Sequence, residues 1–163
     1  MTGASGLDQF VALLLDNHET ALTDQRGLGH RLREDHAHRL AIRRYAEMAE
    51  VDRKAAGQVV RRLHRQIFLL DDRVGGVLDP AHVGPVAEAL VRRSLGVVDD
   101  AAVEEADATY LRIEEVRRQI PLSWSLKRVR GTEPDDEAMR ALERELDGLE
   151  RRFAEIWVRW CTG

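Results

Sequence analysis

Cysteine and aromatic residues are scarce in this 163-residue chain, and long hydrophobic runs are missing. The one cysteine, Cys161, excludes an internal disulfide and has no catalytic partner near it in the sequence. No apolar run reaches the length of a membrane span, and the first residues lack the basic start and apolar core of a secretory signal. We therefore expect a cytoplasmic protein that does not enter a membrane.

Lysine is also rare, because 23 of the 25 basic residues are arginines. This bias fits a GC-rich bacterial genome and is by itself no argument for nucleic-acid binding. The net charge of −4 provides no global field that attracts a polyanion. The charge is uneven, however: residues 26–65 hold 11 Arg/Lys and 5 Asp/Glu, whereas residues 66–116 hold 4 and 11. This split predicts two segments that pack together, a basic ligand face, or both.

The distribution of apolar residues predicts helices throughout. Only 5% of the residues are aromatic, which suits a bundle built from Leu, Val, Ile and Ala. We find no internal repeat and no lasting strand-like alternation. The predicted fold is all-α, a single-domain bundle of five or six helices over residues 1–163. Before the C-terminal helix, the expected helices span about 7–23, 30–50, 53–75, 86–95 and 100–120.

The most regular segment is the C-terminal helix, expected at about 135–160. Its apolar residues recur every three or four positions, which is typical of a helix that buries one narrow face. The acids Glu145 and Glu150 would oppose each other in a parallel homodimer, so we expect the helix to dock against earlier helices of the same chain or of a swapped partner. The residues of this face are Met139, Leu142, Leu146, Leu149, Phe153, Ile156 and Trp160.

The irregular segment 121–134 is basic and contains a tryptophan. Arg and Trp are over-represented where proteins bind each other, although a loop tryptophan also commonly packs into its own core. With the two tryptophans near the C-terminus, this segment predicts contact with a protein partner or a second copy of the chain. The partner-contact candidates are Trp124, Lys127, Arg128, Arg130, Trp157 and Trp160.

Polar residues on the predicted apolar faces suggest a pocket between helices. Arg39 could hold a small anionic ligand and a histidine could transfer a proton, unless Arg39 pairs with Asp35 in a closed core. Asp35 and His38 have the spacing of a di-iron ligand pair, but the matching second pair is missing. We therefore predict no metal and no cofactor. The pocket candidates are His18, Asp35, His38, Arg39 and Tyr110.

Residues 42–51 and 52–63 have the pattern of a helix-turn-helix. The second helix would then carry basic and amide side chains toward phosphates and base edges, although the turn lacks its usual glycine. A row of solvated side chains explains the same residues. The nucleic-acid candidates are Arg53, Lys54, Gln58, Arg61, Arg62 and Arg65.

These patterns support three functions, in decreasing order. The first is a helical binding or regulatory protein that acts through protein or ligand contacts, as a homo-oligomer or with a protein partner. The second is a small enzyme or ligand-binding protein with a pocket inside the bundle, either cofactor-free or metal-assisted. The third is a helix-turn-helix DNA-binding regulator. No residue is assigned as catalytic.

Overall fold

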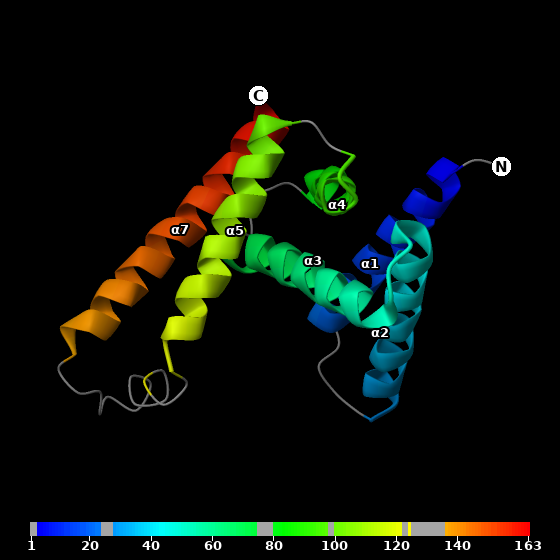
Figure 1. Ribbon diagram of the computed structural model, residues 1–163, viewed down its shortest axis with the longest axis horizontal. Helices are drawn as coiled ribbons and strands as arrows, with labels where there is room; N and C mark the ends of the chain where they lie inside the picture. Colours follow the sequence, from blue (N-terminus) through cyan, green and yellow to red (C-terminus); the bar gives the residue numbers. More distant parts are fainter. Residues whose placement is uncertain (1–2, 24–27, 75–79, 98–99, 122–123, 125–135) are drawn as a thin grey trace. The chain divides into compact units, whose positions relative to one another are not determined.

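The computed structural model describes residues 3–23, 28–74, 80–97, 100–121, 124 and 136–163, and side chains for 6–16, 36–70, 81–97, 100–121, 124 and 136–163. Within these residues the chain forms six α-helices and no strand (Figure 1), so the predicted all-α fold with a long C-terminal helix is confirmed. The helices are α1 (Gly3–Thr23), α2 (Leu28–Ala49), α3 (Arg53–Val74), α4 (Pro80–Ser94), α5 (Ala101–Gln119) and α7 (Glu137–Thr162).

The helices group into two compact units. The first unit, Met1–Asp99, contains α1 to α4, and the second, Asp100–Gly163, contains α5 and α7. In the first unit α2 packs against both α1 and α3, and α4 contacts α1 and α3. Its core holds residues of all four helices, because each contributes one apolar face. Buried representatives are Phe10, Leu14, Ala41, Tyr45, Val60, Leu63, Ile67, Val86, Leu90 and Val91.

Aspartates cap the beginnings of three of the helices. The Asp52 carboxylate accepts the backbone N–H of Ala55 at 2.8 Å and caps α3. Asp100 accepts from Ala102 at the start of α5, and Asp136 accepts from Met139 at the start of α7. Each carboxylate satisfies an N–H that has no acceptor within its helix, and its charge favours the positive end of the helix dipole.

The largest difference from the predicted helix boundaries is at the start of α4. The expected helix 86–95 begins at Pro80 and runs through Pro85. Pro80 costs no hydrogen bond at the first helical position, since that N–H would have no helical acceptor. Pro85 removes only one bond near the start, and the burial of Val86, Ala87 and Leu90 supports the helix beyond it.

The corner between α2 and α3 consists of three residues, Glu50, Val51 and Asp52. Glu50 has φ 56°, in the left-handed region, and the Val51 N–H donates to the Ala46 carbonyl at 3.2 Å. This is the six-to-one bond of a Schellman motif, in which the left-handed residue is normally glycine. Glutamate therefore adopts the conformation that glycine usually provides in such a turn.

The left-handed conformation of Glu50 gives a first prediction. We expect Glu50→Val to destabilise the first unit by about 1–2 kcal/mol, because a β-branched side chain clashes with the backbone at positive φ. Glu50→Asn is the control and should cost little, since asparagine tolerates this region. Urea unfolding followed by far-UV circular dichroism measures both. Equal stability of the two variants would contradict the left-handed geometry.

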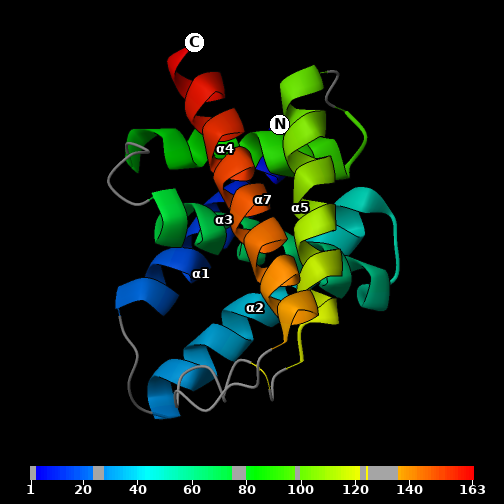
Figure 2. The same cartoon turned by 90° about the vertical axis from the view of Figure 1, so that its left-hand side faces the viewer.

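The second unit is a pair of antiparallel helices (Figure 2). Two ion pairs join these helices: Arg152 pairs with Glu105 near the start of α5, and Arg112 pairs with Glu145 at 2.7 Å near the middle of both helices. The predicted docking of the C-terminal helix thus occurs against α5 of the same chain. Glu145, which would have met its own copy in a parallel dimer, is neutralised by an arginine instead.

The buried face of α7 is centred on Phe153. Phe153, Ile156 and Trp157 are buried, whereas Trp160 is only partly buried. Glu150 is also buried, and its carboxylate lies 3.7 Å from the Arg117 guanidinium. The predicted face is therefore correct at its centre but too narrow. Its leucines at 142, 146 and 149 are partly exposed.

Asp100 ties the two ends of the second unit together. One carboxylate oxygen caps α5, and the other accepts the Trp160 indole N–H at 3.0 Å. The bond from Trp160 is the main reason that the pKa of Asp100 lies below its ordinary value. A carboxylate with a lowered folded-state pKa stabilises the fold above its unfolded pKa, and that contribution is lost as the pH falls through the folded value.

The lowered pKa of Asp100 gives a second prediction, for stability at low pH. We expect the second unit to lose stability below about pH 4, and part of that loss to disappear in Asp100→Asn, which has no carboxylate to protonate. Trp160→Phe should reduce the same pH dependence because it removes the indole donor. The three tryptophans all lie in residues 100–163, so urea unfolding followed by tryptophan fluorescence reports this unit. If both variants lose as much stability at low pH as the wild type does, the Asp100–Trp160 hydrogen bond is not the cause of that loss.

Candidate functional site

Four of the predicted nucleic-acid residues form one line along α3. Lys54, Gln58, Arg61 and Arg65 are exposed and follow each other at intervals of four, three and four residues. At 100° per residue this spacing keeps them on one face, and at 1.5 Å per residue the line is roughly 16 Å long. We call these four residues the α3 face. It begins directly after the three-residue corner that joins α2 to α3.

The other two candidates lie off this line. Arg53 is exposed at the first position of α3. Arg62 is only partly exposed and its Nε is shielded from solvent, unlike the four residues of the α3 face. Arg62 lies about 100° around the helix from Arg61, which turns it toward the neighbouring helices.

The cations of this region are poorly neutralised. Arg53, Lys54 and Arg61 form no ion pair with any residue in the described ranges. In the second unit, by contrast, three exposed arginines of α7 are held by acids: Arg144 by Glu137 at 2.6 Å, Arg151 by Asp147 and Arg152 by Glu105. Residues 36–65 contain eight Arg/Lys and three Asp/Glu. The first unit therefore presents a local positive surface although the chain as a whole is acidic.

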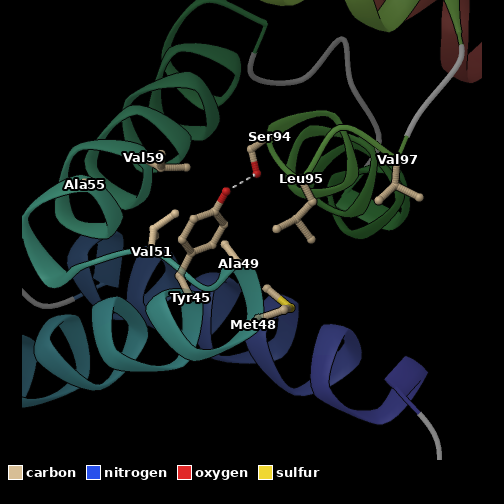
Figure 3. Close-up of a pocket in the computed structure, with 9 residues that line it drawn as sticks. All are labelled: Tyr45, Met48, Ala49, Val51, Ala55, Val59, Ser94, Leu95 and Val97. Atoms are coloured by element: carbon tan, nitrogen blue, oxygen red, sulfur yellow. Dashed lines mark hydrogen bonds between the residues drawn. The ribbon is translucent and has the colours of Figure 1, made fainter.

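A cavity of about 410 Å³ lies beside the same corner (Figure 3). Its walls come from the end of α2, the start of α3 and the end of α4 with the residues that follow it. Among the described residues of its lining, only Tyr45 and Ser94 carry a hydroxyl, and their oxygens are 2.9 Å apart. The remaining lining residues are Met48, Ala49, Val51, Ala55, Val59, Leu95 and Val97.

Tyr45 is almost completely buried, with 2% of its surface exposed. Burial raises the pKa of its phenol above the ordinary value, since the phenolate would lose its hydration. The phenol is therefore neutral at physiological pH. Sequence reasoning missed this site because Tyr45 and Ser94 are 49 residues apart and neither belongs to a recognisable motif.

The predicted pocket of His18, Asp35, His38, Arg39 and Tyr110 is not assembled among the described side chains. We had expected Arg39 on the buried face of its helix, but it is exposed on α2. His38 is partly buried, with its ring 5.9 Å from that of His64. Tyr110 belongs to the second unit, where its ring lies 5.7 Å from Phe153. The side chains of His18 and Asp35 lie outside the described residues.

The tryptophans among the partner-contact candidates are mostly occupied within the chain. Trp124 is buried and donates its indole N–H to Glu143 at 2.8 Å. Of the two alternatives for this tryptophan, the structure therefore shows packing within its own chain. Trp157 is completely buried, and Trp160 is partly buried against it. Lys127, Arg128 and Arg130 lie outside the described residues.

Among the described residues, no group of three or more His, Cys, Asp or Glu side chains is arranged to hold a metal ion. No helix among them combines the length and the apolar character needed to cross a lipid bilayer. Comparison with protein-family models, with characterised proteins and with solved structures finds no match to this chain.

Proposed function

We propose that this chain is a binding protein and that its first unit binds duplex DNA through the α3 face. The observation that carries the proposal is the line of exposed Lys54, Gln58, Arg61 and Arg65, in which Lys54 and Arg61 have no acidic partner among the described residues. Of the three functions predicted from the sequence, DNA binding is the one whose candidate residues form a continuous exposed face.

The proposed contact depends on the charges of side chains. Arg53 and Lys54 lie at the start of α3, next to the Asp52 carboxylate that already caps the helix, so their side chains and not the helix terminus would supply the phosphate contacts. Arg61 and Arg65 extend the positive line toward the middle of the helix. Phosphate contacts of this kind determine affinity and position, but they do not read the sequence.

Gln58 is the uncharged member of the α3 face and has the chemistry for base recognition. A glutamine amide can donate to N7 and accept from N6 of an adenine in the major groove. A helix that follows a short corner is the element that helix-turn-helix proteins place in that groove. The left-handed Glu50 supports this interpretation, since the corner forms without the glycine that such turns usually contain.

Salt dependence of binding tests the proposal. Four phosphate contacts, from Arg53, Lys54, Arg61 and Arg65, predict that the logarithm of the affinity for random-sequence duplex falls with the logarithm of salt concentration at a slope of roughly −3 to −4. Fluorescence anisotropy between about 50 and 200 mM salt measures it. An absence of binding at the low-salt end, or an affinity that does not change with salt, would exclude this function.

A further inference from the structure

The cavity beside the α2–α3 corner has a defined hydrogen-bonding character. The Ser94 hydroxyl lies 2.6 Å from the Val91 carbonyl oxygen. A carbonyl oxygen only accepts, so the single proton of Ser94 points to Val91. The Ser94 oxygen must then accept from Tyr45, which uses the phenol proton as well. Both hydroxyl protons are committed inside the protein, and only oxygen lone pairs remain for a ligand.

The helix ends around the cavity add partial negative charge. α2 ends at Ala49 and α4 at Ser94, and both residues line the cavity. The C-terminal end of a helix carries about half a negative charge, which favours a cation. At the end of α4 the Schellman motif of Gly96, with φ 72°, engages the carbonyls of Arg92 and Arg93. The carbonyls of Ser94 and Leu95 are not among those acceptors.

The walls and the mouth are apolar. Met48, Val59 and Leu95 form part of the lining, and Val51 and Val97 are 40% and 63% exposed. A volume of about 410 Å³ lies within the range of small-molecule sites, roughly 300–1,000 Å³. Apolar walls with a small acceptor group match an aliphatic ligand that ends in a hydrogen-bond donor.

We propose that this cavity binds an aliphatic primary amine in its ammonium form, with the chain against the valines and Met48 and the ammonium group donating to the oxygens of Tyr45 and Ser94. An ammonium group has three donors and no acceptor, so it complements a site that only accepts. A carboxylate has the opposite character and meets oxygen lone pairs with its own. This site does not depend on the proposed binding of DNA.

Three six-carbon probes separate the contributions of donor and charge. Methyl NMR of the full chain, titrated with hexylammonium, hexanol and hexanoate, follows the methyl groups of Met48, Val51, Val59, Leu95 and Val97. We expect saturable shifts confined to these residues, with hexylammonium binding at least about tenfold more tightly than hexanoate and hexanol in between. Hexanoate or hexanol binding as tightly as hexylammonium, or no shift of these methyls by any probe, would overturn the proposal.

Removal of one hydroxyl tests the direction of the hydrogen bonds. In Ser94→Ala the Tyr45 proton loses its acceptor and becomes available to a ligand, so the preference for hexylammonium over hexanoate should fall at least about fivefold. Tyr45→Phe should weaken hexylammonium and leave hexanoate unchanged. The matched control is Thr162→Val, because the Thr162 hydroxyl also donates to a carbonyl of its own helix, that of Val158, but lies in the second unit. If Ser94→Ala prefers hexylammonium over hexanoate as strongly as Thr162→Val does, the two hydroxyls do not form a site that only accepts hydrogen bonds.

Discussion

Replacing Lys54, Arg61 and Arg65 together by alanine should weaken the binding of random-sequence duplex DNA at about 50 mM salt by roughly a hundredfold to a thousandfold. Each lost phosphate contact leaves about one counterion on the DNA, so the salt slope should also flatten by nearly one per residue. The loss should be similar for all duplex sequences, because phosphates are common to them. Anisotropy titrations of wild type and variant over the same salt range measure both quantities.

The control is a second triple variant that also removes three positive charges, but from α7. Arg144, Arg151 and Arg152 are exposed on α7 and are paired with Glu137, Asp147 and Glu105. Their joint replacement by alanine should leave the salt slope unchanged, because the proposed interface lies on α3. Equal losses in the two triple variants would mean that DNA senses only the overall charge, and the α3 face would then have no special role.

Phe153→Ala should destabilise the second unit by about 3–5 kcal/mol. Phe153 is completely buried, and its ring centroid lies 5.7 Å from that of Tyr110 and 6.5 Å from that of Trp157. Its removal deletes apolar contacts, leaves a cavity and breaks the chain of aromatic pairs between α5 and α7. Urea unfolding followed by tryptophan fluorescence gives the change in the free energy of unfolding.

The same substitution at Phe68 provides the comparison. Phe68 lies on α3 in the first unit and is 37% exposed, so Phe68→Ala should cost under about 1 kcal/mol in unfolding followed by circular dichroism. If Phe153→Ala costs no more than this, the aromatic contacts do not hold the second unit together.

The sequence predicted the helices better than it predicted which face of each helix is buried. The sequence predicts Arg39 on the apolar side of its helix when that side is defined by Leu28, Leu32, Ile42, Tyr45, Ala46 and Ala49. The buried Ala41 and Tyr45 define it instead, and Arg39 lies about 200° around the helix from Ala41. On α7, the strict 3.5-residue repeat drifts by about 20° per heptad against a straight helix. Burial therefore extends to Glu150 and Trp157, next to the predicted line.

The helices, their aspartate caps and the docking of the C-terminal helix could be foreseen from the sequence, because each depends on contacts between residues a few positions apart or on one repeated spacing. Three properties emerged only from the folded structure. Arg112 neutralises Glu145, Tyr45 meets Ser94, and Lys54 and Arg61 have no acidic partner within the part of the chain that the structure describes. Those properties depend on which helix faces meet, and segments 33 to 49 residues apart carry no local signal of their pairing. The proposed sites thus owe their elements to local periodicity and their chemistry to packing.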